Sequence, residues 1–295
     1  MTDDHESIGL RFDISALADD PLLKAARIET PLIQAPTDIS ETVRKAACQA
    51  WEDRTRSEYV GVMIVHHFHG LLVDLNAPMD IQEVALTMLK QEQEHAALCM
   101  AAARSLGSEA EVAFDLSELQ LIRTSAPLEN QLINMLIGTY AVGEVVAHRL
   151  LRHAIHALPD TPYQDILRRI FMDEMLHAHI GPAILKSLRK KAEPVWIRCP
   201  DDKTLMGSFG AYIKAMSMRD VIEEDEALLF ENEQYAAELV RLGIPPSLPF
   251  RKAYLEAIMT DIPKAIMRCG IDVAEYPSVV DAIRTVQEEV ETMAI

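Results

Sequence analysis

The sequence predicts an all-α protein: a four-helix bundle with one long crossover, plus an N-terminal arm and additional C-terminal helices. Three observations indicate this fold class. The composition favours helices, because only 11 of 295 residues are Gly while Ala, Leu, Glu and Met are abundant. Turn signals are far apart between residues 38 and 191, which leaves four long helical segments. One connection, residues 108–126, is long enough to cross the full length of a bundle.

These signals divide the chain into three parts. Residues 1–37 form an irregular arm broken by "DDP", "ETP" and "QAP", with enough apolar residues to pack on the rest. Residues 38–191 form the bundle, and residues 192–295 form a C-terminal helical extension that packs on it. We expect three helices in that extension, separated by "CPDDKT", "GIPPSLPF" and "CGIDVAEYP".

The first predicted hairpin joins two helices through the turn "LNAPMD". Asp38 followed by Glu41 resembles a capping box and opens the first helix. Asp80 with Glu83 is a second capping signature and opens the next helix. That helix ends near Gly107, a residue type that suits a helix C-cap.

The second predicted hairpin has its own start and stop signals. Its first helix begins near Pro127 and runs to Leu158. Thr161 caps the following helix, with Pro162 in the first helical position, where a missing N–H costs nothing. That helix ends near Lys191.

The charge and cysteine content exclude several classes of function. A formal net charge of −18 argues against binding the backbone of nucleic acids, which needs clustered Lys and Arg. The acidic N-terminus shows no secretory signal, and no uncharged stretch reaches the ~18 apolar residues that would span a bilayer. The 4 cysteines are scattered with no CxxC pair, as is typical of reduced thiols in a cytosol. We therefore expect a cytoplasmic protein.

Two glutamate–histidine pairs lie on otherwise apolar helix faces. Glu92 and His95 stand at i, i+3 in the second helix, and Glu174 and His177 repeat that spacing in "FMDEMLHAHI" of the fourth. On an α-helix this spacing puts both side chains on one face, here the face that also carries core residues. Burying them is costly unless something neutralises their charge.

The other two helices each supply a glutamate at the matching depth. Glu144 and Glu174 both lie about 20 Å from the turn that joins their helices, at 1.5 Å per residue. In the first helix, the distance of Glu58 from the turn matches that of Glu92 and His95 in the second helix to within one helical turn. Glu52 is two turns further out and is expected to be solvated. The chain thus contains Glu…ExxH twice.

Four carboxylates and two imidazoles are the ligand set with which bundle cores bind paired iron or manganese. The pattern over residues 41–190 resembles the ferritin-like di-iron carboxylate superfamily, and "DEMLH" is similar to the second motif of bacterial multicomponent monooxygenases. The resemblance implies a ferritin-like bundle that holds two Fe ions (Fe2+/Fe3+), or an Mn/Fe pair, with O2 as co-substrate. Six residues map onto the metal-ligand and catalytic positions: Glu58, Glu92, His95, Glu144, Glu174 and His177.

The chain departs from several branches of this superfamily. Storage ferritins usually lack the second ExxH, and rubrerythrins carry two CxxC pairs that are missing here. Acyl-carrier desaturases usually have an acid where this chain has Gln91. Arylamine N-oxygenases have a further histidine where this chain has Ile170.

Three further side chains are candidates for supporting the centre. His148, one turn past Glu144, is either a seventh ligand or neighbour of the metals or an ordinary helix histidine. Asp173 either orients a ligand histidine or lies on the surface. Tyr140 is either a redox-active or hydrogen-bonding phenol or a core tyrosine. The run "HHFHG" at residues 66–70 is interpreted as surface, because consecutive helical residues diverge by about 100°.

The resemblance implies a non-haem di-iron oxidoreductase, an oxygenase or oxidase that uses O2 on a small organic substrate. Hydroxylation, as in a monooxygenase, N-oxygenation and desaturation are the reaction types expected. Two alternatives stay open: a ferroxidase or peroxide-scavenging protein, and a degenerate helical binding scaffold. Expected partners are a small-molecule or carrier-tethered substrate and an electron donor or reductase, with no nucleic acid and no membrane. A homodimer is compatible with this function.

Overall fold

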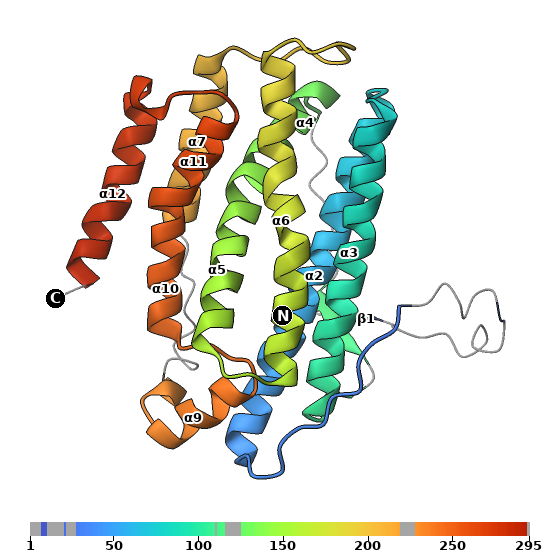
Figure 1. Ribbon diagram of the computed structural model, residues 1–295, viewed down its shortest axis with the longest axis vertical. Coiled ribbons are helices and arrows are strands. Elements are labelled where there is room, and N and C mark those ends of the chain that lie inside the picture. Colours follow the sequence, from blue (N-terminus) through green and yellow to red (C-terminus); the bar gives the residue numbers. More distant parts are fainter. Residues whose placement is uncertain are drawn as a thin grey trace, which may run out of the picture.

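Four long helical segments run side by side along the longest axis of the molecule (Figure 1). The structure is a computed structural model that describes residues 7–10, 21, 28–109, 111–115, 125–218 and 228–293. The described chain is mostly helical, as predicted. The four segments are α2 (Glu41–Asp74), α3 (Met79–Ser105), the continuous run of α4 (Leu128–Met135), η2 (Leu136–Gly143) and α5 (Glu144–Ala157), and α6 (Pro162–Arg189).

The helix boundaries confirm some predicted caps and correct others. Thr161 caps α6 by accepting a hydrogen bond from the Gln164 amide, with Pro162 in the first helical position. Gly107 has a positive φ of 102° just past the end of α3, which is the conformation expected of a C-cap glycine. The capping box at Asp38 is wrong, because α2 begins after Ser40.

The other predicted start signal is also wrong. Helix α3 begins at Met79 directly after Pro78, so Asp80 lies inside its first turn and caps nothing from the N-cap position. Its carboxylate Oδ1 instead accepts from the neighbouring Ile81 amide. An acid in this turn still stabilises the helix through its dipole.

A π-helical segment interrupts the third long helix just before Glu144. Residues of η2 form this wider turn, where the sequence predicts ordinary α-helix. Helix α6 approaches η2 very closely at Gly181, where a Cβ would lie 2.6 Å from the Leu136 carbonyl oxygen and 2.7 Å from Tyr140 Cβ. Only glycine permits this approach, so α6 and η2 are packed backbone to backbone at the middle of the bundle.

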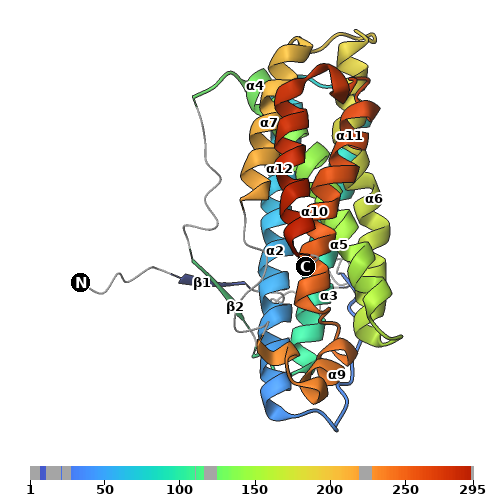
Figure 2. The same cartoon turned by 90° about the vertical axis from the view of Figure 1, so that its left-hand side faces the viewer.

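The connection between the two hairpins contains a short strand. β2 (Val112–Asp115) pairs antiparallel with β1 (Ser7–Leu10) of the N-terminal arm, with Ser7 opposite Asp115. The arm predicted to be irregular therefore contributes a strand. Figure 2 shows this pair beside α2. Residues 116–124 of the predicted crossover lie outside the described part of the chain.

The C-terminal part contains more helices than the three expected. α7 packs on η2, α10 packs on α5, α11 packs on α5 and α6, and α12 packs on α7. In Figure 1 these helices stand on the α5 side of the bundle, away from α2 and α3. Within the described residues, no helix has the length and apolar character needed to cross a membrane. The bounds are α7 (Asp202–Ser217), α9 (Glu233–Arg241), α10 (Ser247–Glu256), η3 (Ala257–Asp261), α11 (Ile262–Arg268), η4 (Val273–Glu275) and α12 (Pro277–Met293).

Candidate metal centre

Charged side chains form a polar layer between two apolar clusters of the bundle core. On α3, Met88 belongs to one cluster and Cys99 to the other, and Glu92 and His95 stand between them. Along α6 the order is reversed: Ile170 belongs to the second cluster and Ala178 to the first, with Glu174 and His177 between them. Both clusters are tightly buried, so bulk water is excluded from the ends of the polar layer.

The polar layer consists of two groups that can each hold a metal ion. In each group the ligand atoms lie within 4.8 Å of one another. All six side chains predicted as ligands are in this layer, and every one of the four long helical segments contributes. The first group is Glu58, His95 and Glu174, and the second is Glu92, Glu144 and His177.

Glu92 and Glu174 stand between the two histidines. Glu174 places Oε1 3.5 Å from His95 Nδ1 and Oε2 3.2 Å from His177 Nδ1. Glu92 places Oε1 3.2 Å from His177 Nδ1 and Oε2 4.0 Å from His95 Nδ1. Each of these carboxylates therefore offers one oxygen to each group. Carboxylates placed this way can bridge two cations.

The remaining two carboxylates each belong to one side. Glu58 Oε2 lies 3.5 Å from His95 Nδ1. Glu144 belongs to the second group, with His177, and its side chain also interacts with Glu174. The layout is a pair of terminal carboxylates, a pair of shared carboxylates and one imidazole per side.

The outer nitrogens of the two histidines are held by residues that cross between helices. Asp173 of α6 lies 3.2 Å from Nε2 of His95 on α3, and Gln91 Oε1 of α3 lies 3.2 Å from Nε2 of His177 on α6. The Gln91 amide nitrogen also donates to Asp173 at 3.0 Å. Since both partners accept hydrogen bonds, each Nε2 carries a proton, and Nδ1 is the nitrogen of each ring that faces the centre.

The carboxylates make both imidazoles strongly basic. Burial lowers the pKa of His177, but Glu174 and Glu92 outweigh burial and raise that pKa to about 11. Burial likewise opposes protonation of His95, and the Glu58 carboxylate leads the charges that raise its pKa to about 9. Without metal, both imidazoles are therefore in their positively charged, doubly protonated form at neutral pH.

Two of the glutamates are also driven toward their neutral form. Burial, followed by the charges of Glu174 and Glu92, raises the pKa of Glu144 well above its usual range. Burial also raises the pKa of Glu92 to about 7, with Glu58 and Glu174 contributing. Protons thus take up charge that four ionised carboxylates would otherwise concentrate in one layer. Two divalent cations would balance the same four charges.

Three buried atoms of the layer make no well-formed hydrogen bond among the described residues: Nδ1 of His95, Nδ1 of His177 and Oε2 of Glu174. They face only one another and the other carboxylates, at 3.2–4.0 Å. Buried polar atoms nearly always make well-formed hydrogen bonds, so three that converge without one indicate a missing partner. Metal ions would satisfy all three at once. Nitrogen and carboxylate oxygen donors in this mixture suit iron and manganese.

The backbone of α2 leaves room for this arrangement. Gly61 lies one turn past Glu58, and a Cβ there would lie 2.7 Å from Cδ of Glu92, with the carboxylate oxygen Oε2 nearer still. Any side chain at this position would displace the Glu92 carboxylate. Glu58 and Glu144 are only half-buried, whereas the other four predicted ligands are buried.

The supporting candidates have different outcomes. Asp173 contacts a predicted ligand histidine, which is the geometry expected of an orienting carboxylate. Tyr140 is fully buried with its ring 4.7 Å from that of Phe68, and its hydroxyl has no partner in the described part of the chain. His148 is in neither metal group and stacks on Phe171 at 4.5 Å, and burial lowers its pKa.

Other sequence candidates lie elsewhere. Glu52 accepts a hydrogen bond from Ser108 at 2.6 Å and is in neither metal group. The histidines at residues 66–69 belong to no metal-binding group among the described residues. Gln91, which the sequence marks only as a departure from desaturases, holds His177 on the facing helix. Gln91 directly precedes Glu92 just as Asp173 directly precedes Glu174, and this matching position is the signal in the sequence for that role.

Comparison of the chain with protein-family models, with curated proteins and with solved structures finds no match.

Proposed function

We propose that the chain is a di-iron oxidoreductase that uses O2 to oxidise a small organic substrate. The observation that carries this proposal is the placement of Glu92 and Glu174, each with one oxygen toward each ligand histidine. Such carboxylates hold two metals close together, which a mononuclear site does not need. The chemistry that a bound iron pair supplies is the two-electron reduction of O2.

The proposed roles of the ligands follow from their positions. Glu58, His95 and Glu174 would hold one metal ion, and Glu92, Glu144 and His177 would hold the other. The shared placement of Glu92 and Glu174 would keep the two ions close together. Hard, anionic oxygens stabilise ferric iron, and carboxylates can change between terminal and bridging positions. The neutral imidazoles complete the set without adding charge.

Residues around the ligands prepare the site before metal arrives. Asp173 and Gln91 fix the tautomer and ring orientation of the two histidines. The apolar clusters on both sides exclude water, which protects an oxidising centre from side reactions. Gly61 keeps space for the Glu92 carboxylate.

A substrate other than iron is supported by the additional helices. α7, α10, α11 and α12 add a layer against η2, α5 and α6, beyond what a four-helix bundle needs to hold a metal pair. Such a layer provides walls for an organic substrate. An electron donor would be needed to return the irons to the ferrous state after each turnover.

An anaerobic Fe(II) titration followed by mixing with O2 tests the proposal. We expect two irons per chain and a transient visible absorption band after mixing, with two coupled irons by Mössbauer spectroscopy. Glu144→Ala removes a terminal carboxylate and should hold about one iron. Glu52→Ala removes a glutamate that lies outside the centre and is the matched control, expected to behave as wild type.

The outcomes separate the competing functions. One iron or none in wild type, unchanged in Glu144→Ala, would refute the di-iron centre. Two irons with growth of a ferric mineral and no organic product would identify a ferroxidase instead. Oxygen uptake that depends on an added organic compound and yields its oxidised product would support the proposed reaction.

A further inference from the structure

Two adjoining cavities form a groove where α6 faces α5 and α11. Their volumes are about 370 and 460 Å³, and they share His179 and Arg268. Cavities of this size suit a small organic molecule. Pro182, Ala183 and Ala192 add apolar surface to one of them. We call the two together the basic groove.

The charge of the basic groove is opposite to that of the chain. The protein carries 28 Lys and Arg against 46 Asp and Glu, for a net charge of −18. Among the described residues that line the groove, however, Asp261 is the only acidic one. The cations that line it are Arg149, Arg152, Lys186, Lys190, Lys264 and Arg268. A cleft lined by one sign of charge concentrates ions of the other sign.

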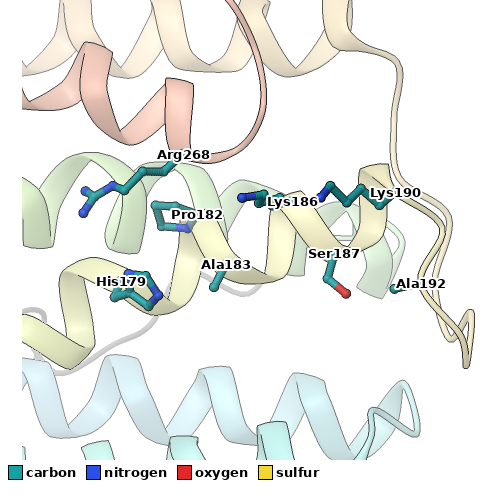
Figure 3. Close-up of a pocket in the computed structure, with 8 residues that line it drawn as sticks. All are labelled: His179, Pro182, Ala183, Lys186, Ser187, Lys190, Ala192 and Arg268. Atoms are coloured by element: carbon teal, nitrogen blue, oxygen red, sulfur yellow. The ribbon is translucent and has the colours of Figure 1, made fainter.

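Part of this positive charge is already neutralised and part is not. Lys264 pairs with Asp261 at 3.1 Å, and Arg149 lies 3.5 Å from the same carboxylate. By contrast, Lys186, Lys190 and Arg268 have no ion-pair partner within the described ranges. Figure 3 shows their basic ends in one row between α6 and α11.

The charge of this row exceeds what a helix terminus needs. Basic residues near the end of α6 are expected because they interact with the helix dipole. Arg189 fills that role and is paired with Asp202 at 2.6 Å. Arg268 comes from a different helix and converges on the same cavity. Convergence of cations from two helices is how anionic groups are recognised.

The basic groove lies against the helices that carry the candidate metal centre. Val145, Met175 and Ala178 line it, and each directly follows one of the predicted ligands in the chain. Consecutive helical residues diverge by about 100°, so the groove and the centre share the α5–α6 wall. His148, which also lines the groove, is close enough to the centre for Glu174 to affect its pKa, although burial has the larger effect.

From these observations we propose that the basic groove binds the phosphate or carboxylate group of a small organic molecule, with Lys186, Lys190 and Arg268 as the anchoring cations. That this molecule is the substrate of the metal centre rests on the function proposed above. Anion binding by itself does not rest on that proposed function, because it requires only the basic groove.

The test measures binding of three probes that share a short alkyl chain: butyl phosphate, pentanoate and 1-pentanol. The full chain is used as purified, with its metal content determined on the same sample, and saturation is followed by ligand-observed NMR. We expect one or both anions to saturate and the neutral alcohol not to. The triple variant Lys186→Ala/Lys190→Ala/Arg268→Ala should bind the anion at least about 10-fold more weakly.

A matched control removes the same charge elsewhere. Lys45→Ala/Lys203→Ala/Lys214→Ala takes three exposed cations from α2 and α7, none of which lines the groove. It should keep the wild-type affinity to within about 2-fold, apart from a small effect of net charge. The preferred probe then tells phosphate from carboxylate.

Three results would overturn the proposal: no saturable anion binding, equal binding of the alcohol, or equal loss in both triple variants. Failure of this proposal is distinct from failure of the proposed function. A sample with two irons and no anion binding would refute the groove alone, whereas anion binding without metal would refute the centre alone.

Discussion

Replacing Gly61 by alanine tests whether the Glu92 carboxylate is held in place as a metal ligand. In α2 this glycine faces Glu92 across the helix pair, and an added Cβ would lie 2.7 Å from Glu92 Cδ. Ordinary van der Waals contact begins at 3.4 Å, so the carboxylate must move by at least ~0.7 Å. A ligand displaced that far no longer spans both metal groups.

The expected effect on metal affinity follows from this displacement. Loss of positioning around a metal site typically costs 10- to 100-fold in affinity, or about 1.4–2.8 kcal/mol. Gly61→Ala should therefore bind Fe(II) more weakly by a factor in this range. An anaerobic titration against a chromophoric chelator measures the difference.

Gly70→Ala is the matched control on the same helix. A Cβ at Gly70 meets nothing within 4 Å, so this variant gains only the helix propensity of alanine, about 0.5–1 kcal/mol. Its iron affinity should equal that of wild type. If Gly61→Ala and Gly70→Ala bind two irons equally well, Glu92 is not held as a ligand and the bridged centre is wrong.

Three further predictions concern the surroundings of the centre. The metal-free protein should lose stability as the pH rises through about 9 and then about 11, because His95 and His177 have those pKa values when folded and about 6.5 when unfolded. The contribution of these two histidines to the free energy of unfolding is fully present below about pH 6.5. Urea titrations from there to about pH 11 measure its loss, and a free energy of unfolding that does not change with pH would contradict the prediction. Asp173→Ala leaves His95 Nε2 unheld and should weaken Fe(II) binding about 10- to 100-fold, whereas an unchanged titration would rule out its orienting role. Gly181→Ala forces α6 away from the Leu136 carbonyl and should lower the free energy of unfolding by about 1–3 kcal/mol, seen as a lower urea midpoint; an unmoved midpoint would show that the two helices separate freely.

The positions of the helices and the ligand pattern could be predicted because they depend on local chemistry. Thr161 and Pro162 act within one turn of backbone, and the structure has them as expected. The i, i+3 spacing of Glu92 and His95 places them on one face in any α-helix. Depth measured from a tight turn then brought Glu144 and Glu174 to one level, and the two side chains do interact.

Several features could not be predicted because partners distant in the chain compete with local ones. Asp38 has the residue type of an N-cap, but its carboxylate binds Arg241, which is 203 residues away. The π-helical turn of η2 has no distinct composition, and its close contact with Gly181 comes from another helix. Gln91 has no partner in sequence, since the histidine that it holds is on α6.

The basic groove illustrates the same limit. Lys186 and Lys190 are near a helix end, where the sequence alone explains them by the helix dipole. Their convergence with Arg268 depends on α11 packing against α6. Charge that is dispersed along the chain becomes a site only when helices bring it together.

The sequence by itself determined the four long helical segments and which face of each carries carboxylates and imidazoles, because helix propensity, capping and periodicity act over a few residues. Only the tertiary structure decided how those faces combine. It places Glu92 and Glu174 between the two histidines. It also brings Asp173 and Gln91 each into contact with the histidine of the facing helix. These arrangements depend on interhelical distances of a few ångströms, which side-chain packing in the assembled core sets and local chemistry does not.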